Sequence, residues 1–333
     1  MRYLQENNNV EKYKSDSKDM SIIGILSSDA RIPLTRIAKK VKLSRDAVKY
    51  RIDQYEKRGI IQGYRTVVDI KKFGYDKYHL FLKLNNPSSS IEEKLRKKFV
   101  SYPFTRAVIK FSGNYDYELA IVAKDIQELD KIISKIIEDC SSSLHESDLL
   151  LLPKTYIAET FPPNFPGHIQ NKSSQYSSNQ KIDKKDIEIL KILGDSAKTP
   201  LHELETKVKL SADAISYRIK NMIKSGTIIK FVPVINYTSL NYNLHTLLLN
   251  ISSFDEKKEK ILKDFLQIDK NTLWATKTIG KYNVLIYLLV KNVDELQETL
   301  IKLRGLFPAQ INHYETLIAY EEYKYIYFPK ELF

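Results

Sequence analysis

The string PLTRIAKKVKLSRDAVKYRI, from Pro33 to Ile52, recurs later in the chain as PLHELETKVKLSADAISYRI, from Pro200 to Ile219. The offset is 167 residues, and the same ungapped offset pairs Gly59 with Gly226. A period this long is no solenoid unit, because each copy can hold one or two small domains with their own cores. The sequence therefore predicts a tandem duplication that covers both halves nearly end to end.

Composition restricts the class of protein. The chain has 333 residues, of which 43% are hydrophobic and 28% charged, an ordinary globular mixture. A single cysteine, Cys140, excludes disulfide frameworks and thiolate zinc sites. The first sixteen residues lack an apolar signal-peptide core, and the longest apolar run, Val284 to Val290, is far short of a membrane helix. We expect a cytoplasmic protein in a reducing compartment, with no membrane association.

The front of each copy has helical periodicity with two breaks. Apolar residues at three-residue spacing predict a first helix, capped by Asp19 in copy one and by Asp183 or Asp186 in copy two. A short second helix follows Pro33, and Ser44 is a natural N-cap for a third helix. Three short helices with a tight turn before a capped third helix are typical of a helix-turn-helix domain.

The third helix of each copy has an apolar face and a polar face. In copy one Val48, Ile52 and Tyr55 share the predicted inner face. The counterparts in copy two are Ile215, Ile219 and Met222. The residues left to face outward are Arg45, Asp46, Lys49, Tyr50 and Asp53 in copy one, and Ala212, Asp213, Ser216, Tyr217 and Lys220 in copy two.

After Gly59 and Gly226 the periodicity becomes strand-like, and the order of elements is β-α-β-β-α-β. This order predicts a ferredoxin-like sandwich, an α+β fold, with a capping box formed by Ser90 and Glu93. The strands are expected at 77–84, 106–112, 117–123 and 145–152, and in copy two at 244–251, 273–279, 284–289 and 312–319. The free face of one sheet is most simply buried against the sheet of the other copy.

These patterns predict five segments. The helix-turn-helix domains are 17–64 and 182–231, the sandwiches are 65–161 and 232–333, and a flexible linker rich in Pro, Ser and Asn spans 162–181.

The net charge of +12 is concentrated in two of these segments. Residues 17–64 hold 11 basic and 5 acidic side chains, and residues 182–231 hold 10 and 7. The two sandwiches are almost neutral, at +1 and 0. A lysine-rich composition that decorates every surface should not spare the sandwiches, so the charge indicates phosphate neutralisation by the helix-turn-helix domains.

Three strings resemble the Lrp/AsnC family of feast/famine regulators: LSRDAVKYRIDQYEKRGIIQGY at 43–64, FGYDKYHLFLKL at 73–84 and SGNYDYELAIVA at 112–123. The resemblance implies, in each copy, a DNA-binding domain, a strand linker and a ferredoxin-like module that dimerises and senses small molecules. Copy two departs from the family pattern, because its loop reads Gly280-Lys281-Tyr282-Asn283 and lacks the carboxylate. The fused copies would form an intramolecular pseudo-dimer, and chains could associate further into homo-oligomers.

Double-stranded DNA is therefore the expected partner. The candidate DNA-binding residues are Ser44, Arg45, Lys49, Tyr50, Arg51, Ser211, Ser216, Tyr217, Arg218 and Lys220. Arg45 is the best candidate for a bidentate contact to guanine, and Lys49 lies one turn further on. A packing or positioning role is the alternative for Tyr50, Tyr217 and the two arginines that follow them. Asp46 and Asp213 suit the helix dipole better than they suit a base.

The loop Gly113-Asn114-Tyr115-Asp116 is the candidate effector site, where Asp116 could bind the ammonium group of an amino acid. The alternative is a tight hairpin whose Gly and Asn only satisfy turn geometry.

A different class also shares this two-domain build, because some relatives of the family are siroheme decarboxylases. That chemistry needs His and Arg beside a Tyr-Asn pair. Copy two has Tyr282-Asn283, but the preceding residues 276–281 contain neither His nor Arg. The six histidines are scattered without metal-ligand spacing, so we expect no cofactor, no metal and no catalytic residues.

Overall fold

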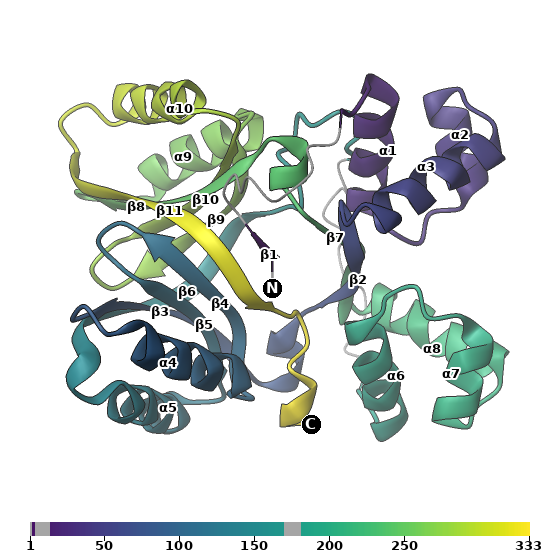
Figure 1. Ribbon diagram of the computed structural model, residues 1–333, viewed down its shortest axis with the longest axis horizontal. Coiled ribbons are helices and arrows are strands. Elements are labelled where there is room, and N and C mark those ends of the chain that lie inside the picture. The colour runs from purple at the N-terminus through teal and green to yellow at the C-terminus, as the bar shows by residue number, and fades with distance from the viewer. Residues whose placement is uncertain (1, 4–13, 170–180) are drawn as a thin grey trace. The chain divides into compact units, whose positions relative to one another are not determined.

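The computed structural model describes residues 2–3, 14–169 and 181–333. The chain divides into two compact units, and each unit takes segments from both copies of the repeat. One unit contains 76–164 and 237–325, and the other contains 14–75, 165–236 and 326–333 (Figure 1). The sandwich regions of the two copies therefore form one unit, and their helix-turn-helix regions form the other.

The described residues of the helical unit form two sets of three helices. Their bounds are Ser17–Ser28 (α1), Leu34–Val41 (α2) and Arg45–Lys57 (α3) in copy one, and Lys184–Asp195 (α6), Leu201–Val208 (α7) and Ala212–Lys224 (α8) in copy two. The predicted inner faces of both third helices are confirmed, since Val48, Tyr55, Ile215 and Met222 are fully buried. Helix α3 ends at Lys57.

One predicted cap in copy one was wrong. The N-cap of α1 is Asp16, whose side chain accepts a hydrogen bond from the backbone N–H of Asp19. The Asp19 carboxylate in turn accepts from the Asp16 N–H, which completes a capping box. Asp183 and Asp186 form the same box on α6. The apolar periodicity does not distinguish the N-cap from the third helical position, because both favour acidic residues.

A two-stranded antiparallel sheet joins the two helix-turn-helix domains. Strand β2 (Ile61–Val68) pairs with β7 (Ile228–Ile235), and each strand leaves the third helix of its own copy. The first helix of each copy packs on the strand of the other copy, α1 on β7 and α6 on β2. Backbone hydrogen bonds follow the same exchange, from Ala30 N to Phe231 O (2.8 Å) and from Ala197 N to Tyr64 O (3.0 Å).

In the second unit, the residues that the structure describes form strands covered by four helices. Its strands are Arg2–Tyr3 (β1), Asp76–Leu84 (β3), Thr105–Ser112 (β4), Tyr117–Ala123 (β5), Leu144–Ala158 (β6), Asn243–Ile251 (β8), Thr272–Ile279 (β9), Val284–Val290 (β10) and Ile311–Tyr325 (β11). Its helices are Ser89–Ser101 (α4), Ile126–Cys140 (α5), Glu256–Ile268 (α9) and Val293–Leu306 (α10). Short 3-10 helices cover 141–143 and 238–240 in this unit, and 70–73 and 330–332 in the helical unit. The β-α-β-β-α-β order predicted for each copy is confirmed.

Strands β6 and β11 are longer than predicted because each pairs with both copies. The first half of β6 pairs with β3, and its second half, from Leu151 to Ala158, pairs with β9 of copy two. Strand β11 pairs likewise with β8 and then, from Ile318 to Tyr325, with β4 of copy one. These exchanges close eight strands into a continuous ring in the order β11-β4-β5-β3-β6-β9-β10-β8. The sequence showed no partner for the extensions, which accounts for the short prediction.

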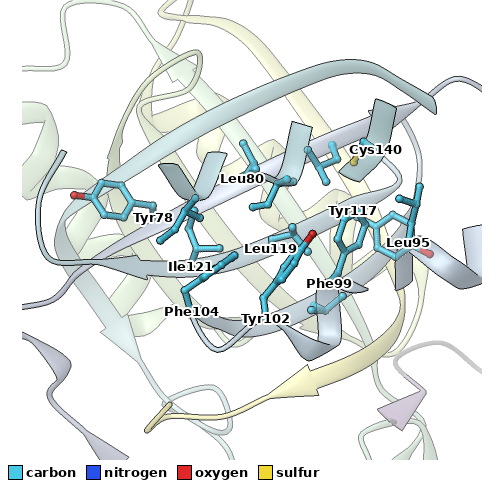
Figure 2. Packing of buried hydrophobic residues seen from close by; sticks show 14 of the residues in the cluster. Tyr78, Leu80, Leu95, Phe99, Tyr102, Phe104, Tyr117, Leu119, Ile121 and Cys140 are labelled. Atoms are coloured by element: carbon cyan, nitrogen blue, oxygen red, sulfur yellow. The ribbon is translucent and has the colours of Figure 1, made fainter. Parts of the chain in front are cut away.

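Each copy buries a core between its strands and its own helices. In copy one the core includes Leu80, Leu119 and Phe99 together with Cys140, which is buried (Figure 2). An equivalent core in copy two lies under α9 and α10. Helix α4 begins after Ser88, and its N-terminus has no side-chain cap. The predicted capping box of Ser90 and Glu93 was therefore wrong, and Glu93 instead pairs with Lys97 at 2.9 Å.

The opposite faces of the two sets of strands contact each other, as expected. The rings of His79 on β3 and Trp274 on β9 stack at 5.6 Å. The Tyr287 hydroxyl on β10 donates to Glu118 on β5, a carboxylate that is completely buried. Burial and this carboxylate raise the pKa of Tyr287 well above its ordinary value. The pairing of the copies therefore includes a buried polar cluster as well as strand exchange.

Residues 165–169 of the predicted linker pack against α1. Phe165 is buried, and the backbone N–H of Ile169 donates to the Ser28 hydroxyl at 2.8 Å. A Cβ at Gly24 would lie 2.0 Å from the carbonyl oxygen of Pro166. Residues 162–169 thus differ from the flexible linker that their composition indicates, and 170–180 lie outside the described residues.

Two helical glycines give opposite expectations for the same substitution. Alanine in place of a helical glycine normally stabilises a protein by up to about 1 kcal/mol. We expect that gain for Gly305→Ala on α10, where a Cβ meets nothing within 4 Å. Gly24→Ala should instead cost about 1–3 kcal/mol, because the Cβ collides with the backbone of 166–168. Urea unfolding followed by circular dichroism measures both, and equal gains in stability would contradict the contact at Gly24.

Candidate nucleic-acid interface

The start of each third helix is fixed by a left-handed residue and a serine cap. The residue after α2, Lys42, has φ 55°, and the residue after α7, Lys209, has φ 58°. The Ser44 hydroxyl then accepts from the Ala47 N–H at 3.1 Å, and Ser211 caps α8 in the same way. Both serines, predicted as DNA-binding residues, therefore hold the tight turn that orients the third helix.

Two of the predicted DNA-binding arginines are bound to carboxylates. Arg51 on α3 donates to Asp16 at 2.9 Å and to Asp19, which is almost fully buried. Arg218 on α8 donates to Asp183 at 2.7 Å and to Asp186 at 2.9 Å. In each domain one guanidinium nitrogen, Nη1, donates to both carboxylates of the capping box, and these charge-assisted hydrogen bonds join the third helix to the first. The structure favours the positioning role for both arginines.

The electrostatics of these boxes agree with their geometry. A backbone hydrogen bond from Asp186 and the bond from Arg218 lower the pKa of Asp183, and its carboxylate raises the pKa of the guanidinium of Arg218. A carboxyl whose pKa is lowered by folding stabilises the protein above its unfolded pKa, and this contribution is lost as the pH falls through the folded value. The link between Asp183 and Arg218 should therefore weaken in acid.

The outward face of α3 carries the remaining predicted residues of copy one. Arg45, Lys49 and Tyr50 are all exposed, and the Tyr50 side chain is 65% exposed. Arg45 has only one ionic neighbour among the described residues, the exposed Asp46 at 3.4 Å. A cation and a tyrosine without strong internal partners are available to a ligand at this face.

The outward face of α8 resembles that of α3 but carries fewer exposed cations. Tyr217 is 67% exposed and Lys220 is exposed, but Ser216 is half-buried. The two exposed tyrosines occupy the same position of the repeat. Exposed aromatic side chains at matching positions favour a surface role over a packing role for both.

The second helix contributes a set of charges that the sequence reasoning missed. Arg36, Lys39 and Lys40 are exposed on α2, beside the third helix. Their counterparts on α7 are Glu203, Thr206 and Lys207. Over the second and third helices the net charge is +5 for residues 34–57 and +2 for residues 201–224. Alignment of the two copies, residue by residue, contains this signal.

The candidate effector loop is held by hydrogen bonds within the sheet unit. The Asp116 carboxylate accepts from the Leu84 N–H at 2.6 Å, and Asn283 of copy two accepts from the Ile251 N–H at 3.0 Å. The same bond is made with and without a carboxylate, so it belongs to the turn. Asn114 accepts from Lys83 at 3.0 Å. This geometry favours the hairpin interpretation, and binding of an effector stays a prediction.

Lys281 of copy two reaches the loop of copy one. Its ammonium lies 3.0 Å from both Glu146 and Asp148, and 3.0 Å from the hydroxyl of Tyr115. The Tyr115 hydroxyl donates to Asp148. Burial and this carboxylate raise the pKa of Tyr115. Tyr115 therefore takes part in a polar contact between the copies.

The described residues contain neither a metal-binding cluster nor a membrane-spanning helix. No group of three or more His, Cys, Asp or Glu among these residues could hold a metal ion. Within the same part of the chain, every helix is too short or too polar to cross a membrane.

Comparison with known proteins agrees with this geometry. Residues 16–56 match the AsnC-type helix-turn-helix domain, and residues 182–229 match the winged helix-turn-helix DNA-binding model. The chain is 36% identical over 119 residues to the HTH-type transcriptional regulator LrpA of Pyrococcus horikoshii, covering 36% of this chain and 83% of that protein. It belongs to the Lrp/AsnC family of transcriptional regulators. The regulatory protein AsnC of Haemophilus influenzae is 30% identical over 123 residues, which are 37% of this chain and 81% of that protein.

A solved structure resembles this Lrp/AsnC chain over nearly its whole length. It is the siroheme decarboxylase NirDL, with a TM-score of 0.61, 93% of each chain covered and 13% sequence identity. At that identity the likeness shows the fold alone. In the Tyr282-Asn283 pair, the Asn283 amide makes hydrogen bonds to both the N–H and the C=O of Ile251. The likeness therefore does not favour the decarboxylase alternative.

The positioning role of the arginines predicts a loss of stability. Removing the Arg51 side chain leaves the buried Asp19 with one fewer charged partner, so Arg51→Ala should cost about 1–3 kcal/mol of unfolding free energy. Arg218→Ala should behave alike. The exposed Arg45→Ala is the matched control and should stay within about 0.5 kcal/mol of the wild type. Urea denaturation measures all three, and an Arg51→Ala variant as stable as the control would contradict the assignment.

Proposed function

We propose that this Lrp/AsnC regulator binds double-stranded DNA with sequence specificity, as a single-chain pseudo-dimer. One observation carries the proposal: two third helices with exposed outer faces are held in one compact unit by the β2–β7 pairing. In helix-turn-helix proteins this helix enters the major groove, and two copies address half-sites about one helical turn, or roughly 34 Å, apart. Here the spacing is set within one polypeptide.

The helix-turn-helix domain of copy one makes the stronger contacts to DNA. Arg45 can form the bidentate contact to guanine, and Lys49 lies on the same exposed face one turn later. The cations of α2 suit phosphate contacts, which position the helix without reading sequence. Tyr50 and Tyr217 provide the same exposed aromatic contact in both copies.

Copy two should read its half-site weakly. Arg45 is replaced by Ala212 and Lys49 by Ser216, while Lys220 is an exposed cation on the outer face of α8. Two unequal helix-turn-helix domains fit an asymmetric operator, in which one half-site is bound strongly and the other weakly.

Reciprocal substitutions test this assignment. The probe is a labelled duplex selected by the wild-type chain from a random pool, and the readout is fluorescence anisotropy. A good bidentate contact is worth about 1–3 kcal/mol, so Arg45→Ala should weaken binding about 5-fold to 150-fold. Ala212→Arg should strengthen it and change the preferred base in the weak half-site. Equal, negligible effects of both would refute the assignment, and a wild-type chain that ignores duplex DNA at low salt would refute the function.

Modulation by a small molecule is the finer part of the proposal. We propose that an amino acid binds at the loop Gly113–Asp116, because only copy one carries a carboxylate at this position of the repeat. Asp116→Ala removes the carboxylate and the turn bond to Leu84, whereas Asn283→Ala removes the two amide hydrogen bonds to Ile251 in copy two and no carboxylate. Calorimetric titration with amino acids should give heat that Asp116→Ala abolishes and Asn283→Ala keeps. No heat with any of them would remove the effector.

A further inference from the structure

The first backbone amide of α8 is bound to a carboxylate from α7. The Ala212 N–H donates to Oε1 of Glu205 at 2.6 Å. Glu205 lies on the last turns of α7 and is partly exposed. The matching position in copy one is Ala38, which has no acceptor to offer the N–H of Arg45. The recognition helix of copy two therefore begins with a negative charge that copy one lacks.

This carboxylate lies where a DNA phosphate would be attracted. The N-terminus of a helix carries about half a positive charge and unpaired N–H groups, and both favour an anion. Glu205 takes one of those N–H groups and brings its own negative charge to the same place. A phosphate approaching α8 would lose a hydrogen-bond donor and meet electrostatic repulsion.

The other differences between the copies act in a different way. The changes from Arg45 to Ala212 and from Lys49 to Ser216 remove attractive contacts. Glu205 adds a repulsive one, at a position where alanine would serve the fold, as it does in copy one. Specificity commonly uses a repulsive element together with lost attraction.

We propose that Glu205 is a specificity-determining residue that holds the second helix-turn-helix domain at low DNA affinity. Its carboxylate weakens the phosphate contacts of α8, so the first domain decides where and in which direction the chain binds. The inference rests on the proposed function, since it names the residue that makes the two half-sites unequal.

A purely structural role for Glu205 would give different results. As a cap it would stabilise α8 through hydrogen bonding and leave the salt dependence of DNA binding unchanged. Glu205→Gln separates the two roles, because the amide oxygen can still accept from Ala212 while the charge is gone. Ala38→Glu places the same carboxylate in copy one. Glu188→Gln on α6, whose side chain pairs with Lys185 at 2.8 Å, changes the net charge equally and is the matched control.

The experiment measures affinity for a labelled duplex of random sequence at several salt concentrations. Each phosphate contact contributes about 0.9 to the slope of log K against log salt. One contact more therefore raises the affinity at 0.1 M salt by up to about eightfold, relative to 1 M salt. Glu205→Gln should raise affinity about threefold to eightfold and steepen the slope by up to about 0.9. Ala38→Glu should weaken binding and flatten the slope, while Glu188→Gln should change the affinity less than twofold. Thermal melting of each variant confirms that it is folded.

A footprint on the selected operator locates the effect. Glu205→Gln should strengthen protection of the weakly read half-site and leave the strong half unchanged. If Glu205→Gln and Glu188→Gln behave alike, or if both halves strengthen together, the inference is overturned. A wild-type chain that binds the duplex and weakens on Arg45→Ala, but ignores Glu205→Gln, overturns only this inference. A wild-type chain that binds no duplex overturns the proposed function as well.

Discussion

The second halves of β6 and β11 form backbone hydrogen bonds with strands of the other copy, and the rest of the sheet unit depends on this exchange. Without it, each copy would expose an unpaired strand edge and an uncovered sheet face, which are costly in water and prone to association. The strands β2 and β7 repeat the arrangement in the helical unit. Each copy therefore lacks backbone partners that the other supplies, in both compact units.

Covalent fusion changes what such a pairing permits. Pairing within one chain has an effective concentration in the millimolar range or above, so it does not depend on the amount of protein. Two identical subunits must also present identical reading faces, whereas two fused copies can diverge. The buried polar cluster between the copies has diverged in the same way. Its carboxylate, Glu118 in copy one, has Leu285 as its counterpart in copy two. Fusion thus keeps the exchange and releases the surfaces from symmetry.

The sequence predicts those elements that depend on residues close together in the chain. It does not predict features that depend on contacts between distant segments. The serine caps, the inner faces of α3 and α8 and the order of the sandwich elements depend on residues close in sequence, so periodicity revealed them. The ends of β6 and β11 depend on strands more than a hundred residues away. The sequence places Arg51 among the DNA-binding candidates because it does not reveal the partners of this residue. These are Asp16 and Asp19, which lie 35 and 32 residues earlier, at the start of another helix. A long-range ion pair leaves no periodic signal.

In the proposed complex with DNA, the difference between the outer faces of α3 and α8 sets the orientation of the chain. If α3 is placed on the half-site that fits α8, the contact between Arg45 and guanine is lost and nothing in copy two replaces it at the strong half. A loss of about 1–3 kcal/mol makes the reversed orientation about 5-fold to 150-fold rarer. Repulsion at Glu205 limits the binding free energy that α8 can contribute at a matching half-site. The preferred orientation on DNA is therefore set by the first domain. On this proposal a few surface residues give the pseudo-symmetric scaffold polarity on DNA, while both copies exchange their long strands in the same way.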